Sequence, residues 1–559
     1  MPEVRPKELW IFVSANCFVE NEVTRVCDVF RRASACGFSR VILHDAKFAR
    51  LDKVPKCYFG NLQTLREAAS SNGLKILPST CPIGYSNSFL TRYPNLAEGL
   101  PVRSAIFKID GSQAQIQPTV VWDSDQPQSA KPKMHLDPAV RWHEGELTYC
   151  IQSKERARMR MRVAVRPFQH YQLTLEIKTD ELRGQVQVQP MGVPRGANGN
   201  EQPGRRLCYT DLSVASSQDW TTYKLTFNSL DHSMIDLLIG SWGAEHGSYS
   251  IRGIKLESCG AVNLVRSETA PIEVKLVNPR GGPRGGPRGG PGGGPGGDSG
   301  GDSVQLMEGI DFETWEDPLL GNDPVAGSFG PWHPSPPIRL KRDFPNGSHL
   351  EVSYYHTHVI GPDQVCAALG NSRFVELLKD HIRRVAAQFP NCDWMMNHDE
   401  VRLLGWMPTN IPELGPSPTS EQILTHNVET CQQSIKSVAP QADLWVWSDM
   451  FDPYHNAIDQ YYLVRDSLAH LRLPKSIGVV NWNEGKKAQS LQYFAERGHR
   501  QAIGAYYDQP LEQTKQWLDC ITTNNIQGVD AFLYTTWKKD YKELESFSEL
   551  VRSHPWFEC

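Results

Sequence analysis

The sequence predicts an α/β fold, a (β/α)8 barrel of the TIM type that is interrupted by an all-β, jelly-roll-like sandwich. Two observations lead to this prediction. Short apolar runs alternate with helical patterns in the first hundred residues and again beyond residue 390, which is typical of a parallel α/β sheet. Between about 102 and 260, apolar residues recur with a period of two, which indicates many short antiparallel strands.

The elements of the α/β part follow in order. Strands are expected to start near residues 9, 40, 74, 350, 393, 444, 477, 502 and 531. Helices are expected over 21–35, 62–71, 374–389, 420–437, 457–469, 487–497, 511–524 and 542–553. A barrel needs eight strands. The strand beginning at Leu350 is therefore assigned as the extra one, because it follows the insert.

The domain organisation follows from these patterns. Residues 1–100 are expected to form the first part of the barrel, and residues 346–559 the remainder. Residues 101–270 resemble a carbohydrate-binding module, although a purely structural insert remains open. Residues 271–345 are expected to be a linker whose Gly/Pro-rich loop, 279–303, lacks apolar residues to bury and should be disordered.

Composition narrows the function classes. The 559 residues carry a net charge of -5 with a pI of about 6.4, so no nucleic-acid partner is expected. No run approaches 18 apolar residues, so no membrane span is expected. The N-terminus lacks the apolar core of a signal peptide, which suggests an intracellular chain or one whose leader has been removed. The oligomeric state stays open.

Polar and aromatic residues gather where the predicted strands end. The carboxyl ends of barrel strands meet at one face, where active sites of such barrels lie. The residues expected there are His44, Asp45, His398, Asp399, Glu400, Trp447, Asp449, Trp482, Tyr506, Asp508 and Trp537. Carboxylates beside aromatic rings suit the hydrolysis of glycosidic bonds, which needs a protonated acid and a group that stabilises positive charge.

The ordered set of residues at these strand ends resembles family 20 glycoside hydrolases, the β-N-acetylhexosaminidases. The family has Asp-Glu after strand four, a Trp on each of strands five and six, Tyr-x-Asp on strand seven and Trp-x-Glu on strand eight. This chain offers Asp399-Glu400, Trp447, Trp482, Tyr506-Tyr507-Asp508 and Trp537 in that order. The resemblance covers residues 1–100 and 390–559.

The resemblance implies a retaining, substrate-assisted hydrolase of N-acetylhexosamine-containing glycans. Glu400 would be the general acid/base, and Asp399 would orient the 2-acetamido group whose carbonyl attacks the anomeric carbon. Tyr506 would donate to that carbonyl, and Asp508 would hold sugar hydroxyls. Trp447, Trp482 and Trp537 would wall the acetamido pocket. The partner is then an oligosaccharide or glycoconjugate, and no cofactor is implied.

The chain departs from the family pattern at three places. Asn397-His398 replace the two glycines that precede Asp-Glu, and Ser14 and Asn16 stand where strand one of the family has an Arg. Lys538-Lys539 follow Trp537 in place of the x-Glu motif. These two lysines would suit an acidic sugar.

Three other hypotheses remain. The chain could be a glycosidase for a different sugar with a carboxylate nucleophile, such as Asp449 or Asp45. It could be a carbohydrate-binding protein without activity. A metal site is a weaker option, since His356-x-His358 has a suitable spacing but lies in a strand-like stretch; its other candidate ligands are His44, Asp45 and His398.

Overall fold

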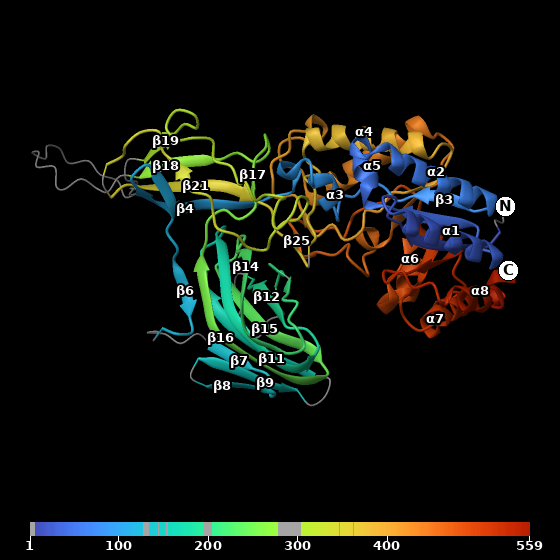
Figure 1. Cartoon of the computed structure of the whole chain (residues 1–559), viewed down its shortest axis with the longest axis horizontal. Coiled ribbons are helices and arrows are strands. Elements are labelled where there is room, and N and C mark those ends of the chain that lie inside the picture. Colours follow the sequence, from blue (N-terminus) through green and yellow to red (C-terminus); the bar gives the residue numbers. More distant parts are fainter. Residues whose placement is uncertain are drawn as a thin grey trace, which may run out of the picture. The chain divides into compact units, whose positions relative to one another are not determined.

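Contacts between residues divide the chain into two compact units. Unit 1 contains residues 1–89, 366–405 and 409–559, and unit 2 contains 90–365 and 406–408. The structure is a computed structural model (Figure 1). It describes residues 6–126, 133–143, 145–151, 155–194, 204–208, 210–277, 303–345, 347–361 and 363–558.

Unit 1 is built on a parallel sheet of eight strands. In order across the sheet they are β22 (Trp394–Met395), β24 (Leu444–Trp447), β26 (Ile477–Asn481), β27 (Gln501–Tyr507), β28 (Val529–Thr535), β1 (Glu8–Ser14), β2 (Arg40–His44) and β3 (Lys75–Pro78). These are the eight strands that the sequence predicts. All seven neighbouring pairs are parallel.

The sheet closes almost completely on itself. Its end strands, β3 and β22, meet at a parallel bridge between Ser79 and Met395. The backbone N–H of Thr80 donates to the carbonyl of Met395 at 2.8 Å. Closure leaves no long free edge, and it brings the carboxyl ends of all eight strands around one opening.

Large apolar side chains fill the interior of this sheet. The buried cluster takes at least one residue from each strand: Trp10, Phe12, Ile42, Leu77, Met395, Trp445, Trp447, Val480, Ala502, Ala531 and Leu533. The rings of Trp10 and Trp445 meet edge to face, with centroids 4.7 Å apart. The interior is therefore a packed core below the opening, as in other small barrels.

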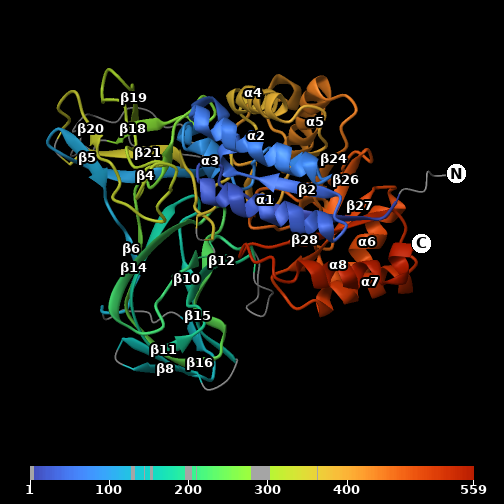
Figure 2. The same ribbon diagram turned by 45° about the vertical axis from the view of Figure 1, so that its right-hand side comes forward.

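Helices connect most of these strands. They are α1 (Glu20–Ala35), α2 (Lys56–Ser71), α4 (Ser372–Gln388), α5 (Ser420–Val438), α6 (Lys487–Glu496), α7 (Glu512–Thr523) and α8 (Leu544–Arg552). In Figure 2, α4 and α5 lie above the strands of unit 1, and α7 and α8 lie below them. Thr419 and Gln422 form a capping box at the start of α5, which satisfies backbone N–H groups that a helix leaves unpaired.

The helix predicted over 457–469 is wrong. This segment contains the short strand β25 (Leu463–Val464), which pairs in parallel with β23 (Leu403–Leu404). The backbone N–H of Leu463 donates to the carbonyl of Arg402 at 2.9 Å. Tyr462, with a φ of 43°, lies outside the helical region. Pairing with a distant segment therefore overrides the local helical spacing.

Unit 2 is built mainly of β-sheets. One sheet has five strands: β13 (Thr210–Asp211), β12 (Gln187–Gly192), β15 (Met234–Ala244), β10 (Glu155–Ala164) and β7 (Lys133–Leu136). A second contains β14 (Gln218–Asn228), β11 (His170–Arg183), β16 (His246–Ser258), β9 (Glu146–Ile151) and β8 (Val140–His143), with β6 (Val120–Asp123) paired to β16.

A third sheet of unit 2 includes the strand that begins near Leu350. Its strands are β19 (Ser303–Leu306), β18 (Glu273–Val277), β21 (His349–His356), β4 (Leu100–Asp110), β5 (Gln113–Ile116) and β20 (Ile338–Arg339), with β17 (Leu264–Val265) paired to β21. The strand near Leu350 lies outside the eight-stranded sheet, as expected, and it is antiparallel to its neighbours β18 and β4.

Much of the segment expected to be a linker belongs to this third sheet. Strands β18, β19 and β20 fall within 271–345, and Phe312 and Trp315 are buried in its core. Buried aromatic residues favour an ordered segment over a solvated linker. The loop expected over 279–303 lies outside the described residues, apart from Ser303.

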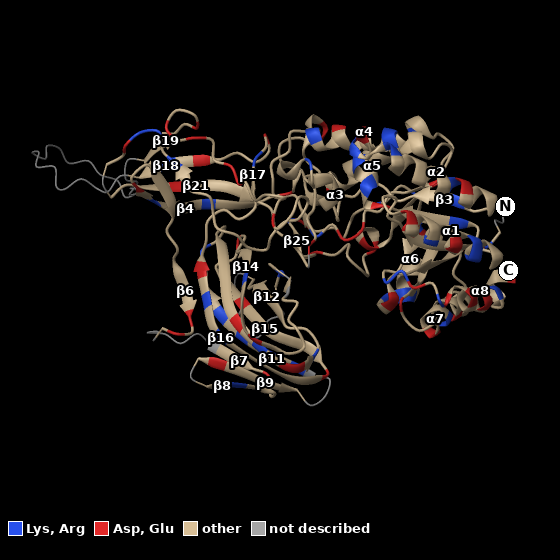
Figure 3. Ribbon diagram, in the orientation of Figure 1, with Lys and Arg blue, Asp and Glu red and all other residues tan. Residues whose placement is uncertain are grey.

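Charged residues of both signs are interspersed over the helices of unit 1 and the strands of unit 2 (Figure 3). None of the helices in the described ranges combines the length and the apolar character that a membrane span needs.

Candidate active site

A cavity of about 500 Å³ lies at the carboxyl ends of the strands of unit 1. It is lined by Phe12, His44, Ser79, Pro82, Ile83, Gly84, Tyr85, Asn397, Asp399, Glu400, Trp447, Trp482, Tyr507 and Trp537. Each of the eight strands supplies a lining residue from its carboxyl-terminal half or from the segment just after it. We call this cavity the central pocket.

The turn after β22 brings two carboxyl groups to the central pocket. Asn397, His398 and Glu400 have φ angles of 59°, 65° and 46°, a region that favours glycine and is uncommon for other residues. Side chains hold this turn in place. The Asn397 amide donates to the carbonyl of Thr80 at 2.8 Å, and the His398 ring contacts the carbonyl of Met396 at 2.8 Å.

Gly84 explains why the loop after β3 can lie directly against this turn. A Cβ atom at Gly84 would come within 2.2 Å of the Asp399 carbonyl oxygen. Real side chains cannot approach a backbone so closely. The absence of a side chain at residue 84 therefore lets the two segments pack together at the pocket.

Glu400 is held by a cation and a phenol. Arg402 forms an ion pair with one of its oxygens at 2.7 Å, and the hydroxyl of Tyr85 donates to the other. The Arg402 side chain is 15% exposed, so little water screens the pair. The negative charge of Glu400 is thus neutralised at the pocket surface, while its side chain stays 21% exposed.

Asp449 lies buried beneath the pocket and supports it. It accepts hydrogen bonds from the backbone N–H of Glu400 at 2.9 Å, the amide of Asn456 at 2.8 Å and the indole N–H of Trp482 at 3.4 Å. Asp449 therefore links the turn that carries Glu400 to Trp482, which lines the pocket.

The environment favours the protonated form of two of the three carboxyl groups. Burial, followed by the negative charges of Asp449 and Glu400, raises the pKa of Asp399 to about 8. Burial also raises the pKa of Asp449 to about 7. Asp399 is therefore mostly protonated at neutral pH, which makes a proton available in the pocket.

Aromatic rings also line the central pocket. The rings of Trp482 and Tyr507 are nearly parallel, at 8°, with centroids 6.4 Å apart. Trp537 packs against Phe12 at 5.2 Å and against Tyr507 at 6.1 Å. Tyr507 and Trp537 remain 39% and 53% exposed. Exposed aromatic faces beside polar groups suit ligands with both apolar and polar surfaces.

Six of the residues expected at the site line the central pocket: His44, Asp399, Glu400, Trp447, Trp482 and Trp537. Five others lie elsewhere: Asp449, Asp45, Asp508, His398 and Tyr506. Asp45 is buried and accepts from the backbone N–H groups of Cys17 and Lys47. Asp508 accepts from the Thr536 hydroxyl and the Trp537 N–H, at 2.5 and 2.7 Å.

Tyr506 and His398 also face away from the pocket. The Tyr506 ring stacks on Tyr534 with centroids 4.2 Å apart and contacts Phe547 of α8. Its neighbour Tyr507 lines the pocket, because successive side chains on a strand point to opposite faces. The buried His398 ring lies 3.0 Å from the Asn427 amide oxygen, and burial lowers its pKa to about 4.

Sequence reasoning did not single out Tyr85, Arg402 or Tyr507 as site residues. Arg402 lies two residues after Glu400, and Tyr85 lies in the loop after the third strand. Both therefore stand just after a predicted strand, which is where site residues are expected. Tyr507 could have been chosen over Tyr506 only with the strand register. The described residues include no group of three or more His, Cys, Asp or Glu side chains that could hold a metal ion.

No family model matches the chain, and no curated protein matches it. Among solved structures, a rhamnosidase from Novosphingobium sp. PP1Y is similar over 99% of this chain and 58% of its own, with 9% identity and a TM-score of 0.32. The chain thus spans a little over half of that enzyme's length.

Carbohydrate-binding modules are similar to a smaller part of the chain. A family 4 module covers 23% of this chain and 79% of its own, with 10% identity and a TM-score of 0.19. A family 29 module covers 26% and 89%, with 11% identity and a TM-score of 0.19. Because these scores are low, they do not decide between functions for this chain.

Proposed function

We propose that the chain is a glycoside hydrolase whose substrate sugar binds in the central pocket, on a (β/α)8 barrel with an inserted jelly-roll-like sandwich. One observation supports this most directly. A cluster of three carboxyl groups, Asp399, Glu400 and Asp449, adjoins exposed aromatic rings at one cavity. Glycosidic cleavage needs an acid that carries a proton and a carboxylate that stabilises positive charge.

The preferred roles are those of a retaining, substrate-assisted enzyme for N-acetylhexosamine-containing glycans. Glu400 is then the general acid/base, and Asp399 orients the 2-acetamido group. The carbonyl oxygen of that group attacks the anomeric carbon as the glycosidic bond breaks, and the departing oxygen takes a proton from Glu400. Tyr507, rather than Tyr506, is the tyrosine that can reach the substrate, because it lines the pocket.

The left-handed backbone after β22 is compatible with the resemblance to family 20 glycoside hydrolases. Asn397 and His398 stand where family 20 enzymes have two glycines. They adopt φ angles of 59° and 65°, which glycine adopts without strain. The sequence difference is therefore compatible with a tight turn before Asp399 and Glu400.

A second assignment of roles is favoured by the contacts of Glu400. Arg402 forms an ion pair with Glu400 and the hydroxyl of Tyr85 donates to it, while Asp399 carries the proton. In this alternative Glu400 is the nucleophile, Asp399 is the acid, and no acetamido group is needed. Of the earlier nucleophile candidates, Asp45 lies away from the pocket and Asp449 lies buried beneath it.

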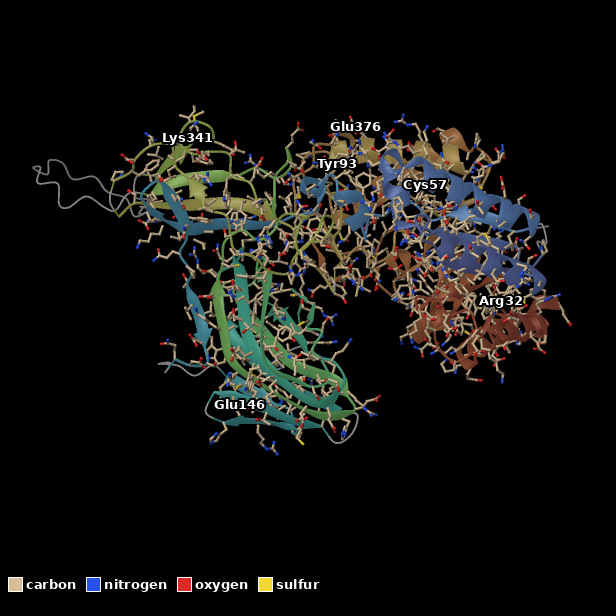
Figure 4. The ribbon with its side chains drawn as sticks, viewed as in Figure 1. Arg32, Cys57, Tyr93, Glu146, Lys341 and Glu376 are labelled. Carbon is tan, nitrogen blue, oxygen red and sulfur yellow. The ribbon has the colours of Figure 1, made fainter. Side chains whose placement is uncertain are left out.

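A screen of aryl glycosides tests the proposal. It compares 2-acetamido sugars, plain hexosides and uronides for the wild type, Glu400→Gln, Asp399→Asn and Glu376→Gln. Glu376 is a matched control, since its side chain is at the outer surface of α4 (Figure 4). We expect Glu400→Gln to lower kcat about 10²–10⁴-fold, and Glu376→Gln to match the wild type. Asp399→Asn should mainly impair 2-acetamido substrates.

Azide distinguishes the two assignments of roles. With an activated leaving group, Glu400→Ala plus azide should give a glycosyl azide of retained configuration if Glu400 is the acid/base. An azide of inverted configuration would make Glu400 the nucleophile. Release from no substrate, together with retained glycan binding, would instead favour a carbohydrate-binding protein without activity.

A further inference from the structure

A second cavity, of about 460 Å³, adjoins the central pocket in unit 1. Its lining includes His455, Glu484, Gly485, Gln509 and Gln513. It also shares Trp482 and Tyr507 with the central pocket. The two nearly parallel rings therefore border both cavities.

The polar groups of the second cavity are suited to sugar hydroxyl and amide groups. Gln509 is exposed and Gln513 is half-buried. Within the described part of the chain, neither side-chain amide forms a hydrogen bond, so donors and acceptors of both remain available. Nδ1 of His455 is buried without a hydrogen-bond partner among the described residues, and the ring packs edge-on against Trp482 at 4.4 Å.

Hydrogen bonds of the neighbouring Asn483 hold the loop that carries Glu484 and Gly485. The amide of Asn483 donates to Asp452 at 3.2 Å, to the Tyr454 carbonyl at 3.0 Å and to the Ser490 hydroxyl at 2.8 Å. Such fixed loops present a preformed cavity, which lowers the entropy lost when a ligand binds. Glu484 keeps 47% of its side chain exposed at this cavity.

We infer that the second cavity is a subsite for another sugar unit of the same glycan. The sugar at the cleaved bond occupies the central pocket, and a neighbouring unit occupies the second cavity, beside Trp482 and Tyr507. Gln509, Gln513 and Glu484 bind its polar groups. This inference rests on the proposed function and extends it, because it makes the preferred substrate a glycan of at least two units.

Two variants act on the second cavity in different ways. Gln513→Ala removes an amide. Gly485→Leu fills the cavity, since a Cβ atom at residue 485 meets only the Asn483 amide oxygen, at 4.0 Å. Gln63→Ala is the matched control, because Gln63 is exposed on α2 and its amide bonds to Glu67. Circular dichroism and Tm of each variant would verify that it folds.

The test compares p-nitrophenyl N-acetylglucosaminide with N-acetylglucosamine oligosaccharides of two to five units. The readout is the ratio of kcat/KM for the oligosaccharide to kcat/KM for the aryl glycoside. We expect this ratio to fall about fivefold in Gln513→Ala, the equivalent of one hydrogen bond, and further in Gly485→Leu. Gln63→Ala should leave it unchanged.

The outcomes separate the inference from the proposed function. If the wild type hydrolyses these substrates and the ratio is unchanged in both folded variants, the second cavity is no subsite. If the wild type cleaves the aryl glycoside but gains nothing from longer chains, the inference is also overturned, while the proposed function stands. If the wild type cleaves none of the probes, the N-acetylhexosaminide proposal fails and this inference fails with it.

Discussion

Four consecutive residues, Asn397 to Glu400, determine how single side chains reach the central pocket. Three of them, Asn397, His398 and Glu400, have left-handed φ angles that turn the chain after β22. On a regular strand, Asp399 and Glu400 would point to opposite faces. The turn removes this constraint, so that both line one cavity. Residues in such sparsely populated conformations cluster at functional sites, where surrounding contacts hold them.

Asp399 gives the first prediction at this scale. Its pKa rises from the ordinary value of 3.8 to about 8 in the folded chain. Between about pH 4 and 8, the folded chain therefore holds a proton that the unfolded chain releases. The free energy of unfolding contributed by this group is highest below about pH 4 and falls as the pH rises through 8.

Asp399→Asn should remove this dependence on pH. The Tm of the variant minus that of the wild type should be larger at about pH 8.5 than at pH 4.5, by roughly 2–4 °C. Thermal denaturation at both pH values measures the difference, and Glu376→Gln is the exposed control. An equal difference at the two pH values would mean that Asp399 titrates as an ordinary carboxyl group.

At the scale of elements, the eight strands could be predicted because each is a short apolar run between turn or helix signals. The central pocket lies at their carboxyl ends, where the sequence places the candidate site. Which of Tyr506 and Tyr507 points into the pocket could not be predicted, because a shift of one residue in the strand register moves every side chain to the opposite face of the sheet. Residues 457–469 were misassigned because pairing with β23 is a long-range interaction.

Strand β26 carries a prediction about packing inside the eight-stranded sheet. A Cβ atom at Gly478 would come within 2.5 Å of the Trp445 ring, which is itself fully buried. Because a closed interior cannot expand, Gly478→Ala should lower the free energy of unfolding by about 1–3 kcal/mol. Denaturation by urea measures this change.

Gly60→Ala is the matched control for this prediction. Gly60 lies in α2 (Lys56–Ser71), and a Cβ atom there meets no other atom within 4 Å. Alanine is the better helix former by about 1 kcal/mol, so this variant should be equally stable or slightly more so. Equal losses in both variants would show that Trp445 does not restrict residue 478.

At the scale of the whole molecule, the central pocket and a cluster of buried histidines lie in different units. Every residue that lines the central pocket belongs to unit 1, although residues 90–365 separate its strands β3 and β22 in the sequence. Unit 2 instead contains a cluster of buried histidines. The rings of His170 and His356 stack with centroids 3.7 Å apart, and His358 is buried two residues further along the chain.

The histidine cluster makes unit 2 sensitive to acid. Burial lowers the pKa of His170 to about 3 and that of His358 to about 4, and it lowers the pKa of His356 as well. Histidines in the unfolded chain titrate near 6.5. Below that pH the unfolded chain binds more protons than the folded chain, so the free energy of unfolding falls as the pH drops from about 6.5 towards 4.

His358→Leu should weaken this acid sensitivity. Nε2 of His358 is buried without a hydrogen-bond partner among the described residues, so replacing the ring by an apolar side chain sacrifices no bond through that atom and removes one titrating group. Tm measured from about pH 7 to 4.5 should fall less steeply in this variant than in the wild type, whereas exposed His246→Leu should follow the wild type. Parallel curves for His358→Leu and the wild type would show that protonation of His358 does not limit acid stability, and the loss would then arise from other groups, among them His170, His356 and the buried His398.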